Sequence, residues 1–263
     1  MPEQRLVFGE DPELYDKARA GYPADLVSAV TAYGELSRND QAVEVGAGTG
    51  KATLAFARAG LRITAIEPSP EMAAVASRNA AGFPAVSVVI SSFEEWDGMQ
   101  DTYDLVFAAQ SWHWIDPAVG YSKAGALLRD RGTLALMWHR TDWSGQPLRD
   151  ELDSLYRRLD PELREFNPGF PGLDPPDDDG SFLEQVAGGG LFTEVEERKF
   201  PRTDTFSAAS FVELLGTQSH HRLLPTDRRE RLLGEVMRLI ERHGGTVEVP
   251  HAIWLVMARR RTR

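Results

Sequence analysis

A buried strand that leads directly into a glycine-rich loop and a helix most limits how this chain can fold. The apolar strand ends in Val43-Glu44-Val45, the loop is Gly46-Ala47-Gly48-Thr49-Gly50, and a helical run begins at Lys51. Such a turn presents backbone N–H groups to a ligand, and glycine lets ligand atoms approach without meeting a Cβ. Dinucleotide sites favour the spacing G-x-G-x-x-G, whereas here Lys51 stands in place of the third glycine.

The loop begins a regular alternation of predicted strands and helices. We expect strands at 43–45, 62–66, 86–90, 104–109 and 133–138, with helices at 51–59, 69–80 and 116–128 between them. Later we expect strands at 192–200 and 253–258, and helices at 208–215 and 227–244. This order predicts a mainly parallel sheet with helices on both faces.

We expect residues 1–263 to form one domain. Its parts are an N-terminal helical cap (1–40), a ligand-binding core (41–141), an insert (142–190) that includes a helix at 148–159, and the C-terminal part of the sheet (191–263). The insert is rich in proline and carries the acidic run 177–179. A long irregular stretch of this kind is either a lid or a surface excursion.

Charge argues against a nucleic-acid partner. The net charge is −11, whereas phosphate backbones attract basic surfaces. Arginines cluster at 228–231 and at 259–261, which we interpret as a solvated helix face and a solvated C-terminal tail.

The absence of cysteine excludes a cysteine nucleophile, thiolate zinc and iron–sulfur clusters. We expect no metal site, because no His pair has clear ligand spacing. No apolar run is long enough to span a bilayer and the N-terminus lacks a signal peptide's features, so we expect a cytoplasmic protein without a membrane partner.

Notable side chains follow the predicted strands where each one ends. In open α/β sheets, ligands bind beyond the carboxyl ends of the strands. Glu67 follows the second strand, and an ionised carboxylate there is able to accept both hydroxyl protons of a ribose. Ser92 and Phe93 follow the third strand, and the run Gln110-Ser111-Trp112-His113-Trp114 follows the fourth.

Together these motifs resemble class I S-adenosylmethionine (SAM) methyltransferases of the bacterial small-molecule type. The resemblance rests on the glycine loop after Glu44, on Glu67, and on a segment running from Tyr15 through Arg19 to Tyr22. It also rests on the 110–114 motif and covers about 15–260. It implies a Rossmann-like, doubly wound, mostly parallel sheet of seven strands whose last strand is antiparallel, with the cap and an insert after strand five.

The resemblance also implies roles for individual residues. The glycine loop would line the amino-acid end of SAM, Glu44 would orient its ammonium group, and Glu67 with Pro68 would hold the ribose. Ser92 and Phe93 would flank the adenine, and Gln110 and Ser111 would approach the methionine portion. Tyr15, Arg19 and Tyr22 would close over the cofactor, with Arg19 as a partner for its carboxylate. The cofactor-binding residues are Tyr15, Arg19, Tyr22, Glu44, Gly46, Ala47, Gly48, Gly50, Glu67, Pro68, Ser92, Phe93, Gln110 and Ser111.

For several of these residues, a purely structural role is the alternative to a role in binding or catalysis. Glu67 would otherwise cap a helix, and Phe93 would otherwise be ordinary core. Trp112 and Trp114 either bind the substrate, where an aromatic wall suits a sulfonium cation, or pack in the core. His113 and His139 are candidate general bases or hydrogen-bonded structural histidines. The pair His220-His221 we place at a helix end near the site.

The function we expect is SAM-dependent methyl transfer to an oxygen, nitrogen or carboxylate of a small metabolite, giving S-adenosylhomocysteine. The fourth strand lacks the Asn/Asp-Pro-Pro-Tyr motif of exocyclic-amine nucleic-acid methyltransferases, which favours a small-molecule acceptor. Two other hypotheses are a SAM-binding sensor or pseudoenzyme and a nicotinamide oxidoreductase. The spacing of the glycines argues against the oxidoreductase.

Overall fold

The computed structural model describes residues 7–143, 145–159 and 181–262. The strands are β1 (Gln41–Val45), β2 (Arg62–Glu67), β3 (Val86–Ile90), β4 (Tyr103–Ala109), β5 (Leu128–Thr141), β6 (Phe192–Ser207) and β7 (Thr246–Arg260). The helices are η1 (Val7–Glu10), α2 (Pro12–Ala18), α3 (Ala24–Gly34), α4 (Lys51–Arg58), α5 (Pro70–Asn79), η2 (Trp112–Trp114), α6 (Pro117–Leu127), α7 (Arg149–Leu159), α8 (Ser181–Gly188), α9 (Ala208–Gly216), α10 (Ser219–Arg222) and α11 (Thr226–Arg242). No helix in these ranges is both long and apolar enough to cross a membrane.

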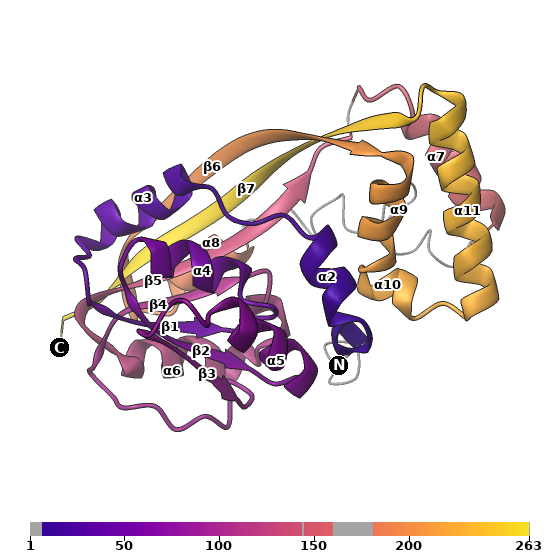
Figure 1. Cartoon of the computed structure of the whole chain (residues 1–263). Coiled ribbons are helices and arrows are strands. Elements are labelled where there is room, and N and C mark those ends of the chain that lie inside the picture. The colour runs from indigo at the N-terminus through magenta and orange to yellow at the C-terminus, as the bar shows by residue number, and fades with distance from the viewer. Residues whose placement is uncertain (1–6, 144, 160–180, 263) are drawn as a thin grey trace. The chain divides into compact units, whose positions relative to one another are not determined.

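The sheet has seven strands in the order β3-β2-β1-β4-β5-β7-β6. The pairs β1–β2, β1–β4, β2–β3 and β4–β5 are parallel. The last strands of the sheet are antiparallel, and the arrow of β7 is opposite to those of β5 and β6 (Figure 1). The predicted Rossmann-like sheet, with its antiparallel last strand, is therefore confirmed.

The chain divides into two compact units. Unit 1 comprises Met1–Arg19, His139–Asp179 and Phe200–Ile253, and unit 2 comprises Ala20–Trp138, Gly180–Lys199 and Trp254–Arg263. Each unit is thus assembled from three separate stretches, and β5, β6 and β7 each pass from one unit into the other along the chain. The predicted N-terminal cap is divided between the units at Arg19.

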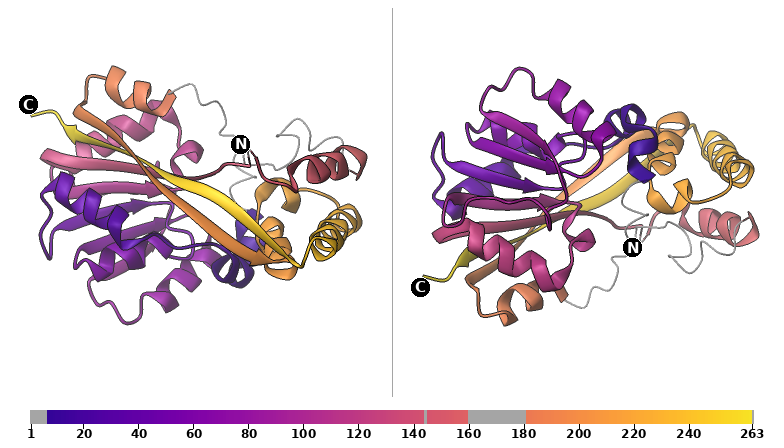
Figure 2. Two further views of the ribbon diagram at one scale, coloured as in Figure 1. Left: turned by 90° about the horizontal axis from the view of Figure 1, so that it is seen from above. Right: turned by 90° about the horizontal axis from the view of Figure 1, so that it is seen from below.

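Unit 2 contains the parallel part of the sheet. Helices α3, α4 and α5 cover one face, and α6 and α8 cover the other (Figure 2). The core on the α6 and α8 side includes Val106, Leu134, Trp138 and Val186, all less than a tenth exposed. Burial on both faces explains why β4 is an almost continuous apolar run.

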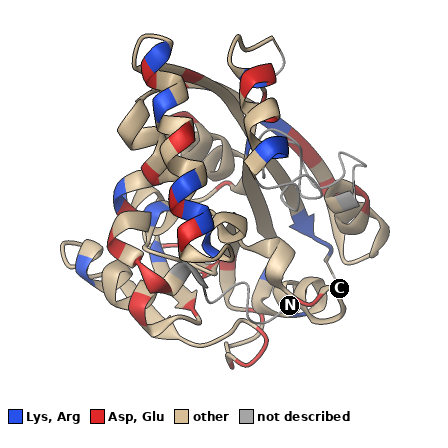
Figure 3. Ribbon diagram, turned by 90° about the vertical axis from the view of Figure 1, so that its right-hand side faces the viewer, with Lys and Arg blue, Asp and Glu red and all other residues tan. Residues whose placement is uncertain are grey.

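Unit 1 is mainly helical. Helices α7, α9 and α11 share a core that includes Leu152, Phe211 and Val236. Leu232, Leu239 and Ile240 of α11 are buried as well, in agreement with the helical spacing of the sequence. Acidic and basic residues are interspersed along the helices on this side of the molecule (Figure 3), so the arginines at 228–231 belong to a helix of mixed charge.

Some predicted boundaries were wrong. Strands β6 and β7 are longer than expected because alternate residues of β6 are exposed, and its polar outer part lacks the apolar run that marks a strand. Helix α11 spans Thr226–Arg242, whereas the expected range was 227–244. Residues 160–180 of the insert, where the lid was considered, lie outside the described residues.

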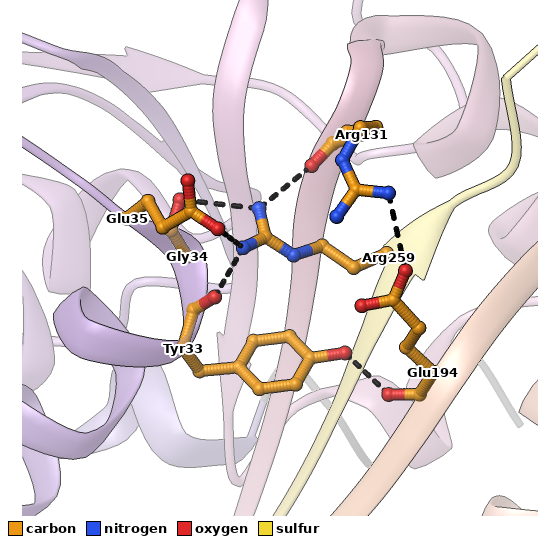
Figure 4. Close-up of polar contacts among 6 residues, drawn as sticks. All are labelled: Tyr33, Gly34, Glu35, Arg131, Glu194 and Arg259. Carbon is orange, nitrogen blue, oxygen red and sulfur yellow. Dashed lines mark hydrogen bonds and ion pairs between the residues drawn. The ribbon is translucent and has the colours of Figure 1, made fainter.

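The expectation of a solvated tail at 259–261 was also wrong for two of its three arginines. Arg259 and Arg260 are 6% and 5% exposed. The Arg259 guanidinium donates to the carbonyl oxygens of Tyr33, Gly34 and Arg131 and pairs with Glu35 at 2.9 Å (Figure 4). Arg260 is likewise bonded to the Asp101 carboxylate and the Leu128 carbonyl. These partners explain how two charged groups are accommodated in a buried strand.

Candidate cofactor site and family

The glycine loop adopts a backbone conformation that requires glycine. Gly46, Gly48 and Gly50 all have positive φ, at 69°, 59° and 86°. A Cβ built on Gly46 would lie 2.6 Å from the Cβ of Ser111, which is a forbidden distance between real atoms. The Ser111 hydroxyl donates to the Val45 carbonyl. The loop after β1 is therefore held tightly against Ser111, the second residue after β4.

Glu67, at the end of β2, is bonded to the glycine loop. Its Oε2 accepts from the Gly48 N–H at 2.8 Å, and its Oε1 accepts from the Ser69 N–H at 2.9 Å. The residue is 7% exposed, and the adjoining Pro68 is half-buried. An ionised carboxylate has about four acceptor sites. The two backbone bonds therefore orient Glu67 and still leave it the capacity to accept ribose hydroxyls.

Helix α5 obtains its own cap from a different residue. The Ser69 hydroxyl accepts from the Met72 N–H at 3.3 Å, as the Ser-Pro start of this helix predicts. Glu67 contributes only by accepting the backbone N–H of Ser69. A role in capping α5 therefore does not account for the hydrogen bond between Glu67 and the Gly48 N–H of the glycine loop.

Glu44 is a second carboxyl group close to the loop. It is 1% exposed, and it accepts a hydrogen bond from the Thr53 hydroxyl in the first turn of α4. Burial raises the pKa of Glu44 to about 8, and the negative charge of Glu67 adds to this effect. A positively charged ligand group near these two carboxyls would stabilise the ionised form of Glu44.

The turn after β3 is ordered by Ser92. Its hydroxyl donates to Glu95 Oε2 at 3.0 Å and accepts from the Glu95 N–H at 3.2 Å. Phe93 is 2% exposed and packs in the core, with its ring centroid 6.1 Å from that of Trp112. The structure thus supports the core interpretation of Phe93, and stacking on adenine stays a prediction.

The turn after β4 contains an unusual backbone conformation. Gln110 has a φ of 63°, which is uncommon for a residue other than glycine, and such conformations cluster at functional sites. Trp112 is 3% exposed and packs against Tyr121 at 5.2 Å, so it belongs to the core. Trp114 is half-buried, with its ring 4.7 Å from the ring of His113.

The two candidate general bases belong to different units. His113 lies in unit 2 and His139 in unit 1. Desolvation lowers the pKa of both imidazoles. His113 is an exposed residue, so solvent limits its shift, whereas His139 is half-buried with its ring 5.5 Å from that of His251. Neutral imidazole is the form able to accept a proton.

The remaining predicted cofactor residues are also divided between the units. Tyr15 and Arg19 lie in unit 1, and Tyr22 lies in unit 2. Arg19 Nε donates to Thr217 Oγ1 at 2.9 Å, and its guanidinium carbon is 5.2 Å from the centre of the Tyr15 ring. Closure of these three residues over a cofactor stays a prediction.

Sequence reasoning missed Thr53 and the N–H groups of Gly48 and Ser69 as partners of the two carboxyls. The hydroxyl in the first helical turn after the loop was the available signal for Thr53. The two backbone N–H donors could not be predicted, because no side chain in the sequence marks them. In the described part of the chain, no group of three or more His, Asp or Glu side chains is arranged to hold a metal ion.

A parallel α/β sheet with a glycine loop after β1 and an acidic residue after β2 defines a protein of the nucleotide-cofactor-binding class. Residues 42–132, which include both features, match the family described as a methyltransferase domain. The relatives below are named as methyltransferases as well, so the chain is similar to methyltransferases over most of its length.

The chain is 27% identical over 241 residues to an uncharacterized methyltransferase of Mycobacterium tuberculosis (strain ATCC 25618 / H37Rv), covering 92% of this chain and 88% of that protein. A putative type II methyltransferase from Anaeromyxobacter dehalogenans has a similar fold, with a TM-score of 0.59, 23% identity, and coverage of 92% and 96%. Phosphoethanolamine N-methyltransferase 2 of Haemonchus contortus, solved in complex with SAM, has a TM-score of 0.53, 14% identity, and coverage of 98% and 57%.

Proposed function

We propose that this protein transfers the methyl group of SAM to an oxygen, nitrogen or carboxylate of a small-molecule acceptor. The observation that carries the proposal is the pair of carboxyls, Glu44 and Glu67, beside the glycine loop. SAM presents two cationic groups and two ribose hydroxyls, which are the partners that these carboxyls need. The methyltransferase family supports the same reaction and gives no support to a nicotinamide oxidoreductase.

Different residues would bind different parts of SAM and of the acceptor. Glu67, oriented by the N–H groups of Gly48 and Ser69, would accept the ribose hydroxyls. Glu44 would face the ammonium group, and Gln110 the methionine portion. Ser92 and Phe93 would contact the adenine, and Trp114 the acceptor.

When bound, SAM supplies an activated methyl group, so the protein mainly aligns the acceptor and excludes water. A carboxylate acceptor needs no base. A hydroxyl or amine acceptor loses a proton during transfer, and the neutral imidazoles of His113 and His139 are the candidates to receive it. The net charge of −11 supports a small-molecule acceptor over a nucleic acid.

Replacing Glu67 tests the cofactor site directly. Glu67→Ala removes two hydrogen bonds to a charged acceptor, each worth about 1.5 kcal/mol, so we expect SAM to bind at least about a hundredfold more weakly in calorimetry. Glu67→Gln keeps the shape of the side chain and should give an intermediate loss. Asp130→Asn, which removes an exposed carboxylate in the same unit, is the matched control.

Unchanged SAM affinity in a folded Glu67→Ala variant would refute the site. Transfer is tested by incubating the protein with methyl-labelled SAM and a metabolite extract. Labelled product supports the proposed enzyme. Tight SAM binding with no labelled product from any extract would instead support a sensor without transferase activity.

A further inference from the structure

Unit 1 contains a polar cluster around α10 that the glycine loop and its carboxyls do not involve. We define the α10 cluster as Arg19, Thr217, Gln218, His220 and His221, all of which lie in unit 1. Arg19 comes from the end of α2, and its guanidinium donates to the side chain and the carbonyl of Thr217 at 2.9 and 3.2 Å. These bonds hold a positive charge next to α10.

Three buried polar atoms of this cluster lack a hydrogen-bond partner within the described ranges. They are Gln218 Oε1, His220 Nε2 and His221 Nδ1. The other ring nitrogen of His221 is satisfied, because Nε2 lies 2.8 Å from the Tyr156 hydroxyl. Most buried polar atoms in proteins have a partner, and leaving one without a partner is costly. Three such atoms in four consecutive residues indicate a place for a polar ligand.

The charge of the cluster indicates the kind of ligand. Arg19 makes no ion pair with any carboxylate among the residues that the structure describes. Desolvation lowers the pKa values of His220 and His221, and the charge of Arg19 adds to this effect, so both rings are neutral at pH 7. A neutral imidazole still carries one N–H donor. The cluster therefore combines one positive charge with hydrogen-bond donors, an arrangement that attracts an oxyanion and repels a cation.

We propose that Arg19 and His220, with the amide of Gln218, form a site in unit 1 that binds the carboxylate of a small organic acid. Gln218 contributes through its amide, whose oxygen and nitrogen positions are interchangeable in assignment, so that its NH₂ group donates. The ligand class is then a small carboxylic acid.

The probe is malonate, titrated by calorimetry into the full chain at constant ionic strength with chloride as the reference anion. Arg19→Met and His220→Phe should each weaken malonate binding at least tenfold. His220→Gln keeps a donor and should restore most of the affinity. Lys17→Met removes one positive charge from the same helix, but Lys17 is exposed and paired with Glu213 at 2.7 Å. The Lys17→Met variant should therefore bind malonate as tightly as the unaltered protein.

Two results would overturn the proposal. One is malonate binding that is no tighter than chloride binding, or that is unchanged in folded Arg19→Met, which would leave the cluster to buried water. The other is loss of malonate binding when SAM is saturating, which would assign the carboxylate site to the cofactor. Equal malonate affinity with and without S-adenosylhomocysteine supports a carboxylate site separate from that of the cofactor.

Titration of SAM in the same variants separates this proposal from the proposed function. A protein that binds malonate through Arg19 but binds no SAM would refute the methyltransferase function and keep the site. A protein that binds SAM and transfers its methyl group, but does not bind malonate, would refute only the site.

Discussion

Glu44 connects stability with cofactor binding at the scale of a single residue. Its carboxyl group is buried, and its pKa is about 8 in the folded protein against 4.5 in the unfolded chain. Between these values the folded state holds a proton that the unfolded state has lost. The stability contributed by this group is therefore full below pH 4.5 and falls as the pH rises toward 8.

Glu44→Gln should stabilise the ligand-free protein by about 2–4 kcal/mol at pH 7, because it removes the cost of protonating this carboxyl on folding. The gain should disappear below pH 4.5. Thermal unfolding from below pH 4.5 to pH 7 measures both the gain and its disappearance. Glu71→Gln, which replaces a carboxylate on α5, is the control. The same Glu44 substitution should weaken SAM binding. A stability gain that does not depend on pH would contradict the assigned cause.

Binding of a cation beside Glu44 should release a proton. The ammonium group of SAM would favour the ionised carboxylate and so lower its pKa from about 8. Calorimetric titrations of SAM at pH 7.5 in buffers of different ionisation enthalpy measure the number of protons released. We expect about half a proton or more, and none in Glu44→Gln. Equal heats in all buffers would show that Glu44 does not face the cation.

At the scale of elements, Arg259 ties three segments of unit 2 together. Its guanidinium binds the last carbonyls of α3, the Glu35 side chain after that helix, and the Arg131 carbonyl in β5 (Figure 4). The last carbonyls of a helix have no partner inside the helix. Arg259, on β7, supplies donors to two of them. The Tyr33 hydroxyl adds a bond to the Glu194 carbonyl in β6 at 2.5 Å.

Arg259→Met should lower the free energy of unfolding by about 2–4 kcal/mol, because it leaves buried carbonyl groups without a donor. For a chain of this size the melting temperature should fall by about 2–4 °C for each kcal/mol. The neighbouring Arg261 is exposed, so Arg261→Met is the matched control. Equal melting temperatures of the two variants would show that the Arg259 contacts contribute nothing to stability.

Local patterns predicted the elements well where neighbouring residues decide the outcome. The strand, glycine loop and helix at 43–58 and the Ser-Pro start of α5 are examples. The burial of Arg259 was missed because its partners are distant in sequence, with Tyr33 226 positions away. Charged residues at the end of a chain resemble a solvated tail unless these partners are known.

The candidate site, like the fold, could be predicted where local sequence decides the structure. The close contact of Gly46 with Ser111 agrees with the prediction that both line one site. The bonds of Glu67 to backbone N–H groups could not be foreseen, because they depend on how the turns after β1 and β2 fold. Whether Trp112 or Trp114 packs in the core was also undecidable, since both residues fit the same local pattern.

At the scale of the whole molecule, the two units should respond differently to acid. His139, His220 and His221 of unit 1 have folded pKa values of about 3, 2 and 3, well below the ordinary value of 6.5. Below pH 6.5 the unfolded chain binds protons that the folded unit does not. Each histidine then costs about 1.4 kcal/mol per pH unit until the folded pKa is reached. In unit 2, Glu44 has the opposite dependence.

Amide hydrogen exchange, corrected for the intrinsic rate, should therefore show that α7, α9 and α11 lose protection between pH 7 and pH 5 before β1 and β4 do. Replacing both His220 and His221 by Gln should reduce this difference. His243→Gln, which changes an exposed histidine of the same unit, is the control. Equal loss of protection in both units would contradict the prediction.

The passage of β5, β6 and β7 between the units bears on the order in which they become complete during synthesis. The last residues of unit 2, Trp254–Arg263, follow every residue of unit 1 in the chain. A growing chain thus contains all of unit 1, and most of unit 2, before the last part of β7, with its Arg259, leaves the ribosome. The unit that contains the glycine loop is begun early in translation, yet it is the last to be closed.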